Sequence, residues 1–364
     1  MDFLHLYTVD AFTSRPFGGN PAGIVKGAEV LTSREMQLLA GEINLSETAY
    51  VFPPRKEGHL ALRFFTPTTE VDICGHATLA ALWVLALEGS LVGPHVQVET
   101  RAGLLEAQIQ YGGAKPQPRH LRRILLGFPP PVRLRSLRKE EEEELERALG
   151  LRPAKDDLDP FGIGGDEAQG NIGVAAGAPG PAPCAVYDIG LNVLVVPVRD
   201  QASLYDIRPR FEELDRLSRR LAVSVIYAFA LPGSRPSAAA EARMFAPRLG
   251  IREEAATGTA AACLARYLLD QGFLGPAGSP AAFPLPHLLG DTDANGVPHL
   301  RLIRPGEGEE EAAQRPRLSF SIQQGEGLRR PSTIEVEVEF SDEGDPRIWV
   351  GGACRPVIQG RYLR

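Results

Sequence analysis

Two glycine-led stretches decide the fold: GHATLAALWVLAL (Gly75–Leu87) and GTAAACLARYLL (Gly258–Leu269). The first carries no charge after His76, and the second is interrupted only by Arg266 and Tyr267 once its first turn is complete. A helix that is apolar on every side must be enclosed on every side. The segments around both stretches are rich in strand-forming residues, so we predict a curved sheet or barrel wrapped around each helix.

The two stretches are parts of a longer repeat. RFFTP (Arg63–Pro67) precedes the first stretch, and RMFAP (Arg243–Pro247) precedes the second. Further upstream, a Gly-Asn turn and an apolar run occur in both halves, at 19–25 and 190–198. A period of about 180 residues is far longer than that of a solenoid repeat. The sequence therefore predicts an α+β protein of two pseudo-symmetric domains, each built around a central apolar helix.

Local signals predict several other elements. Apolar and β-branched content indicates strands at Leu4–Phe12, Thr48–Phe52 and Leu60–Phe65. Thr32 and Glu35 form a capping box, in which the hydroxyl and the carboxylate satisfy the first free amides of a helix. Four apolar residues of that helix then share one face: Met36, Leu39, Ala40 and Ile43. In the second half, we expect the matching helix at Phe211–Leu221 and the matching strand at Val223–Leu231.

We expect the N-terminal lobe to span residues 1–125, together with a C-terminal strand at 353–364. Residues 126–183 are predicted to be a linker that contains a charged helix, and residues 184–352 to be the C-terminal lobe with an irregular insert at 290–316. The five glutamates Glu140–Glu144 indicate a solvated helix face. DTDANG (Asp291–Gly296) resembles the start of a calcium loop, but Leu302 stands where the bidentate glutamate is needed, which favours a turn.

Composition excludes several classes of function. The net charge of −7 over 364 residues provides no basic surface for nucleic acid. No apolar run reaches bilayer length, and the first residues lack a signal-peptide pattern, so we expect a cytoplasmic protein with no membrane contact. The seven histidines are scattered, and no metal site is predicted. The cysteines are too far apart in sequence for a CxxC pair or a disulfide framework: Cys74, Cys184, Cys263 and Cys354.

The beginnings of the two apolar helices are candidate anion sites. A helix N-terminus presents unpaired amides and about half a positive charge. Gly75 and Gly258 would let a carboxylate approach the backbone closely, although each glycine could also serve only to ease the turn into a buried helix. His76 could donate a hydrogen bond or move a proton there, whereas a buried histidine satisfied by a nearby carbonyl is the commoner case. The amides expected to bind substrate are those of Gly75, Ala77, Thr78, Gly258, Thr259 and Ala260.

Glu47 is the candidate acid/base. It lies in NLSETAYVF (Asn44–Phe52), between a helix end and an apolar strand. A carboxylate in an otherwise apolar cleft has a raised pKa, which suits proton transfer near neutral pH. The alternative is an exposed loop carboxylate. Glu254 could instead complement a helix dipole, and Asn20 could simply form a turn.

At these residues the sequence resembles the PhzF family, relatives of diaminopimelate epimerase. The quoted stretches are VDAFTSRPFGGNPAGIV (9–25), NLSETAYV (44–51), RFFTPTTEVDICGHATLAAL (63–82) and EEAATGTAA (253–261). QQGEGLRRPSTIEVEV (323–338) and WVGGACRPVIQG (349–360) also fit. The resemblance covers most of the chain outside the linker and the insert, and it implies the two-lobed fold of diaminopimelate epimerase.

The resemblance also implies roles for individual residues. The family's acid/base glutamate falls on Glu47, and the histidine of its Gly-His pair on His76. Its aspartate falls on Glu254, its proline on Ala255 and its serine on Thr259. Of the two cysteines that exchange the proton in the racemase relatives, the first falls on Cys74. The second falls on Thr257, which disfavours a two-thiol mechanism.

We therefore expect a cofactor-independent isomerase, of a biosynthetic kind, that uses Glu47, His76 and Glu254 on a small carboxylic acid. Asn20 is expected to contribute to substrate binding, and a second copy of the chain is a candidate partner. Two alternatives stay open. One is an amino-acid epimerase, and the other is a non-catalytic small-molecule binding protein on the same fold.

Overall fold

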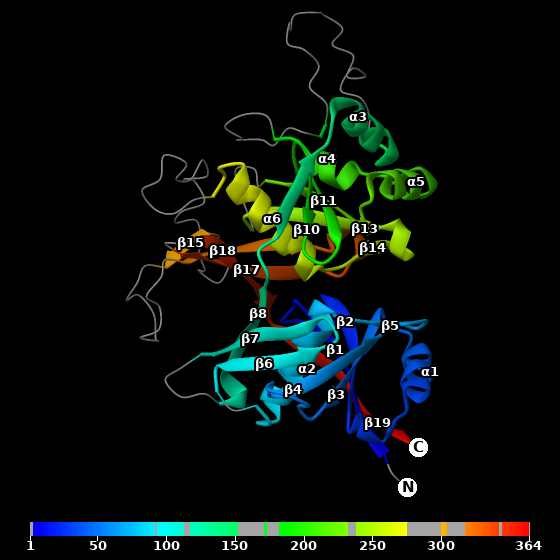
Figure 1. Ribbon diagram of the computed structural model, residues 1–364, viewed down its shortest axis with the longest axis vertical. Helices are drawn as coiled ribbons and strands as arrows, with labels where there is room; N and C mark the ends of the chain where they lie inside the picture. The colour runs from blue at the N-terminus through cyan, green and yellow to red at the C-terminus, as the bar shows by residue number, and fades with distance from the viewer. Residues whose placement is uncertain are drawn as a thin grey trace, which may run out of the picture.

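The computed structural model describes residues 3–91, 93–112, 117–151, 171–172, 182–231, 238–274, 300–303, 317–341 and 344–363. The chain forms two lobes, one above the other in Figure 1, and both ends of the chain lie at the lower lobe. Each lobe is a curved arrangement of strands around one helix. In the described part of the chain, no helix is both long enough and apolar enough to cross a membrane.

The N-terminal lobe contains the first eight strands and the last one. Its elements are β1 (Phe3–Ala11), β2 (Asn20–Lys26), η1 (Ala28–Val30), α1 (Ser33–Ile43), β3 (Glu47–Phe52), β4 (Leu60–Phe65), β5 (Glu70–Val71), α2 (Gly75–Leu87), β6 (His95–Thr100), β7 (Gly103–Tyr111), η2 (Pro118–His120), β8 (Leu121–Phe128) and β19 (Cys354–Leu363). β19 pairs antiparallel with β1 over its whole length. The last strand of the chain therefore belongs to the sheet of the first.

The C-terminal lobe contains the remaining elements. They are β9 (Val132–Ser136), α3 (Lys139–Ala148), β10 (Ala185–Asp188), β11 (Asn192–Pro197), α4 (Gln201–Asp206), α5 (Phe211–Leu221), β12 (Val225–Ala230), β13 (Ala240–Ala246), η4 (Pro247–Leu249), β14 (Ile251–Glu254), α6 (Gly258–Asp270), β15 (Leu300–Ile303), β16 (Arg317–Gln324), η6 (Glu326–Leu328), β17 (Ser332–Ser341) and β18 (Gly344–Gly352). The sheets of the two lobes are joined where β18 pairs antiparallel with β8.

The predicted repeat is confirmed element by element. β2 pairs parallel with β3, and β11 pairs parallel with β12, with α1 or α5 in the connection. The next strand in each lobe then pairs antiparallel with the one before it: β4 with β3, and β13 with β12. α2 and α6 follow at equivalent places, and each is 13 residues long.

The two central helices form the core of their lobes. Every side chain of α2 from His76 to Ala86 is buried, and so are nearly all those of α6 from Ala260 to Leu268. Strands of the same lobe surround each helix (Figure 1). Burying a Leu or Val side chain contributes about 1.5–3 kcal/mol, so the continuous apolar sequence of these helices drives assembly of the lobes around them.

Helix α1 begins and ends as its sequence predicts. The Thr32 hydroxyl accepts a hydrogen bond from the Glu35 amide, and the Glu35 carboxylate accepts one from the Thr32 amide, which completes the capping box. Asn44 ends the helix in the left-handed conformation, with φ of 53°. Met36, Leu39 and Ala40 pack into an apolar cluster on the predicted face.

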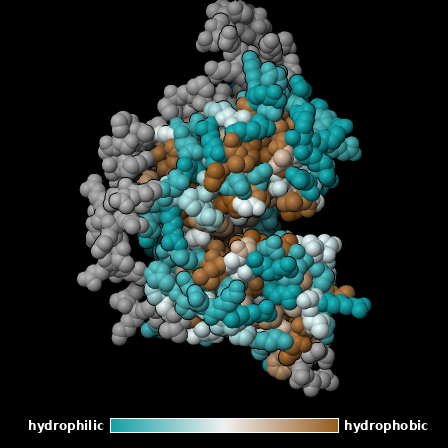
Figure 2. All heavy atoms as spheres, in the orientation of Figure 1, coloured by the Kyte–Doolittle hydropathy of each residue, from teal (hydrophilic) through white to brown (hydrophobic). Residues whose placement is uncertain are grey.

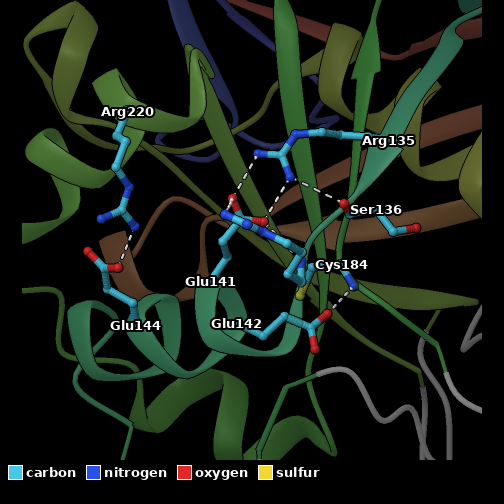
Figure 3. Close-up of polar contacts among 8 residues, drawn as sticks. Arg135, Ser136, Glu141, Glu142, Glu144, Cys184 and Arg220 are labelled. Atoms are coloured by element: carbon cyan, nitrogen blue, oxygen red, sulfur yellow. Dashed lines mark hydrogen bonds and ion pairs between the residues drawn. The ribbon is translucent and has the colours of Figure 1, made fainter.

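The charged helix α3 differs from its prediction as a solvated face. Glu141 is buried and accepts hydrogen bonds from Arg135 on β9, at 2.8 and 3.3 Å (Figure 3). Glu142 accepts a hydrogen bond from the Cys184 amide at 2.8 Å, and Glu144 pairs with Arg220 on α5. The solvated-face prediction is therefore wrong for Glu141 and Glu142, whose partners lie on β9 and directly before β10, whereas Glu144 pairs with Arg220 at the surface.

The segments predicted as linker and insert are only partly described. Within 126–183, β9 pairs with β10 and α3 packs on α5, so both elements lie against the C-terminal lobe. Most of the glycine-rich stretch 162–183 lies outside the described residues, as does DTDANG. The insert 290–316 is not wholly irregular, because β15 pairs antiparallel with β16 within the lobe's sheet.

Candidate active site

The beginnings of α2 and α6 converge between the lobes. Cys74 and Thr257 are the equivalent N-cap residues, both with extended backbones, and neither side chain caps its helix. One side chain from β2, that of Asn20, reaches both places. Its Nδ2 donates to the Ala256 carbonyl at 3.0 Å and lies 3.4 Å from Nδ1 of His76. Two helix N-termini therefore face one small region, which favours binding of an anion there.

Asn20 is held in place by the turn before it. Gly19 has φ of 63°, and a Cβ at this position would lie 2.1 Å from the Ala11 carbonyl oxygen. Only glycine fits such a close approach. Arg330 also fixes this turn, because its guanidinium donates to the carbonyls of Gly18 and Gly19 and pairs with the buried Asp10 at 2.7 Å. The turn connects the two lobes beside the helix starts.

His76 is a buried, neutral imidazole. Burial lowers its pKa, and the nearby Glu254 carboxylate only partly opposes that effect. Its Nδ1 faces two donors, the Asn20 amino group at 3.4 Å and the Cys74 thiol at 3.5 Å. We therefore assign the proton to Nε2, which lies 3.3 Å from Glu47 Oε2 and 3.3 Å from the Ser46 hydroxyl.

Glu47 stands at the start of β3 with its side chain only 15% exposed. Burial raises the pKa of its carboxyl group, and the Ser46 and Cys74 side chains partly offset this effect by hydrogen bonding. Oε2 is buried and has no hydrogen bond of good geometry, despite its 3.3 Å approach to His76. A buried carboxylate oxygen without a hydrogen-bond donor costs free energy, and such groups gather at functional sites.

Glu254 is partly buried, and both of its carboxylate oxygens accept hydrogen bonds. Its Oε1 accepts a hydrogen bond from Asn20 at 2.9 Å, and its Oε2 accepts one from the Thr257 hydroxyl at 2.7 Å. Burial raises the pKa of this carboxyl group, the nearby His76 lowers it, and Glu47 raises it. Both glutamates thus have raised pKa values, but only Glu47 keeps an oxygen free to accept a proton.

The donor atoms of Glu47, Cys74 and His76 lie within 4.8 Å of one another, a spacing that a divalent ion such as zinc could bridge. However, burial and the charge of Glu47 raise the pKa of the Cys74 thiol, which disfavours the thiolate that would bind a metal. Glu47, Cys74 and His76 are therefore best described as a cluster of side chains that hold or accept protons.

The remaining predicted residues differ in whether their amides can bind a substrate. Gly75 to Ala77 and Gly258 to Ala260 form the first turns, and Thr259 lines a cavity between the lobes. Thr78 does not fit its predicted role, because its amide and its hydroxyl both donate to the Cys74 carbonyl, at 3.0 and 2.7 Å. One turn into the helix, the backbone amides have intrahelical partners.

Sequence reasoning missed Gln324, which supports the second helix start. Its Nε2 donates to the Glu254 carbonyl at 2.8 Å, while its Oε1 accepts from the Tyr227 hydroxyl at 3.1 Å. Gln324 comes from β16, 70 positions beyond Glu254 in the chain. Its only signal was its place in the quoted stretch QQGEG, and no local pattern indicates that contact.

The chain matches the family described as phenazine biosynthesis-like protein over residues 9–279. It belongs to this PhzF family. An uncharacterized isomerase of Deinococcus radiodurans is 31% identical, covering 97% of this chain and 92% of the relative. One of Clostridium acetobutylicum is 29% identical, covering 99% of this chain and 98% of the relative. The family assignment made from the quoted motifs is thus confirmed, and the chain is an isomerase.

Solved structures show the same fold. A PhzF-family protein of Bacillus anthracis superimposes with a TM-score of 0.72 at 22% identity, covering 100% of both chains. A hydroxyproline epimerase of Agrobacterium vitis with bound trans-4-hydroxy-L-proline gives a TM-score of 0.55 at 11% identity, covering 100% of this chain and 91% of that one. The predicted α+β, diaminopimelate epimerase-like architecture is confirmed.

Replacing Asn20 by alanine is expected to destabilise the protein by about 1–3 kcal/mol, because the Ala256 carbonyl and the Glu254 carboxylate would lose a buried donor. Its counterpart in the repeat, Asn192, is the matched control, since its Nδ2 donates to the Ala222 carbonyl in an exposed setting. Urea unfolding at neutral pH measures both variants. Equal losses would show that Asn20 has no special role at the junction.

Proposed function

We propose that this isomerase moves a proton between two carbons of a small carboxylic acid, with Glu47 as the acid/base and no cofactor. The observation that carries the proposal is the free, buried Oε2 of Glu47 beside two converging helix starts. Relatives named isomerases support the reaction class.

In the proposed mechanism, the substrate carboxylate accepts hydrogen bonds from the amides of the two first turns, 75–77 and 258–260. These dipoles also stabilise negative charge that develops on the substrate when carbon is deprotonated. The ionised Glu47 takes the proton, and the electron pair of the C–H bond spreads over the conjugated substrate. Glu47 then delivers a proton to a second carbon, and exchange of its carboxyl proton with solvent before this step lets solvent deuterium enter at that carbon. Atoms and electrons balance without an oxidant or reductant.

The neighbouring groups position Glu47 and the substrate. Nε2 of His76 lies 3.3 Å from Glu47 Oε2, so a small movement of either side chain would let the imidazole donate to the ionised carboxylate. Glu254 holds Asn20 and Thr257, so it is a positioning residue for the second helix start. The low polarity around the cluster raises the pKa of Glu47 and so makes it a stronger base once ionised.

Solvent-deuterium exchange followed by NMR tests the proposal across small cyclic amino and hydroxy acids. Deuterium entering at a new carbon, together with migration of a double bond, supports the proton shuttle. Deuterium entering with inversion at a single carbon would identify an amino-acid epimerase instead. Tight binding without any exchange would indicate a binding protein on this fold.

The rate of exchange should rise with pH through the raised pKa of Glu47. Glu47 is a base only when ionised, and burial moves its pKa above the ordinary value of 4.5. The pKa of His76 is lowered from 6.5, so the neutral imidazole persists at neutral pH and causes no fall there. A pH profile of kcat/KM checks this. Because Glu254 also has a raised pKa, the rise must persist in Glu254→Gln, and a flat profile in that variant would contradict the assignment.

A further inference from the structure

A cavity of about 780 Å³ lies between the lobes and reaches both helix starts. Two of its lining residues lie at the helix starts: Ile73 directly precedes the N-cap of α2, and Thr259 is the second residue of α6. Phe128 lines the cavity as well, and its ring would lie 3.5 Å from a Cβ on Gly75. A ligand whose carboxylate binds the helix starts would therefore extend into this cavity.

The walls of the cavity are apolar and come from both lobes. Leu104 and Leu105 on β7 face it from one lobe, and Ile189 and Leu191, beside the β10–β11 turn, from the other. Leu104 is 50% exposed, although it lies on a regular strand. On the face shown in Figure 2, the surface is hollowed between the lobes, and apolar residues gather along the hollow. Exposed apolar surface of this kind marks ligand-binding grooves.

The charged residues around the cavity are paired within the protein. Arg347 pairs with Glu106, Asp345 pairs with Arg266 at 2.8 Å, and Asp72 pairs with Arg101 at 3.2 Å. None of these pairs requires a charged ligand group for its neutralisation. The part of the ligand that lies here is therefore uncharged.

We propose that the substrate is a carboxylic acid with an aryl or alkyl substituent, and that this apolar substituent occupies the cavity while the carboxylate binds the helix starts. The proposal rests on the proposed function for its carboxylate site. The volume of the cavity supports the apolar substituent independently of that site, because about 780 Å³ falls in the upper part of the roughly 300–1,000 Å³ range of cavities that hold drug-sized ligands. A single small ring would leave most of that volume to water.

Calorimetric titration of the full chain with acetate, propionate, butyrate, hexanoate and 3-phenylpropionate tests the proposal. Affinity should rise about fourfold per added methylene, the factor that corresponds to burying one CH₂ group. 3-Phenylpropionate should bind at least about tenfold more tightly than propionate. Equal affinities across the series would overturn the proposal.

Two matched variants localise the effect. Leu104→Asp places a charge on the apolar wall and should abolish the dependence on chain length, with a much larger loss of affinity for hexanoate and 3-phenylpropionate than for acetate. Leu134→Asp is the control, since Leu134 is also an exposed leucine on a strand, at 51%, but does not line the cavity. Persistence of the chain-length dependence in Leu104→Asp, or its loss in both variants, would overturn the assignment.

The two proposals fail separately. Flat affinities together with Glu47-dependent exchange would overturn the cavity assignment alone. Graded affinities without exchange would support the apolar cavity and overturn the proton shuttle. Binding is measurable in Glu47→Gln as well, where the graded affinities should be retained because this substitution leaves the cavity walls intact.

Discussion

Glu47→Gln is expected to lower kcat for proton exchange by about 10²–10⁴-fold, the usual contribution of a general acid–base. Glutamine keeps the volume of the side chain but cannot accept a proton from carbon. Glu47→Asp should show an intermediate loss of about 10²-fold, since moving the carboxylate by about 1 Å is sufficient for that effect. NMR of deuterium incorporation at saturating substrate measures both variants.

The loss in Glu47→Gln should not come from unfolding. A buried carboxyl with a raised pKa binds its proton more tightly in the folded state than in the unfolded state. The contribution of the Glu47 carboxyl group to the free energy of unfolding therefore falls as pH rises from 4.5 through the raised pKa. At neutral pH, the uncharged amide of Glu47→Gln should be tolerated at this position or should stabilise the protein. The melting temperature of Glu47→Gln should equal or exceed that of the parent protein. A matched control is Glu42→Gln on α1, an exposed glutamate whose replacement should leave exchange unchanged.

Retention of full exchange by Glu47→Gln would remove Glu47 from the mechanism. In that case the free Oε2 of Glu47 would have no role in catalysis, and the binding-protein alternative would gain support.

Arg123→Met is expected to have the largest effect on stability, about 3–5 kcal/mol. Arg123 on β8 donates to Glu335 at 2.6 Å and pairs with Glu337, both on β17. Glu337 is only 1% exposed, and its other cation, Arg317, lies farther away at 3.7 Å. Without Arg123, a buried carboxylate would lose its main counter-charge where the two lobes join.

Urea unfolding measures this effect, with Arg122→Met as the control because Arg122 is the exposed neighbour on the same strand. Adding Glu337→Gln to Arg123→Met should restore part of the stability, since a neutral amide is cheaper to bury than an unpaired charge. If the two arginine variants lose equal stability, the buried pair does not stabilise the junction.

The fold was predictable where the signal is local or repeated. The capping box at Thr32 and Glu35 fixes the start of α1 from four consecutive residues. The uniform apolar character of α2 and α6 requires enclosure, and the repeat places the same elements in both lobes. These properties depend on residues close in sequence or on a pattern that occurs twice.

The sequence motifs singled out side chains that cluster between the lobes, but not the contacts between them. Asn20 and Glu254 lie 234 positions apart, and only the assembled lobes bring them to 2.9 Å. The same limitation explains the partners of α3, where Glu144 meets Arg220 on a helix 76 positions away. Thr78 is a different case, because its partner carbonyl is only four positions away and a helix that begins at Gly75 already implies this contact.

The pairing of β19 with β1 has a consequence for synthesis of the chain. The N-terminal lobe emerges first from the ribosome, but its sheet lacks one neighbour of β1 until residues 354–363 have been made. Contacts between such distant segments form late. β18 of the C-terminal lobe ends only two residues before β19 begins, so the N-terminal lobe keeps an open edge beside β1 until all the strands of the C-terminal lobe have been made.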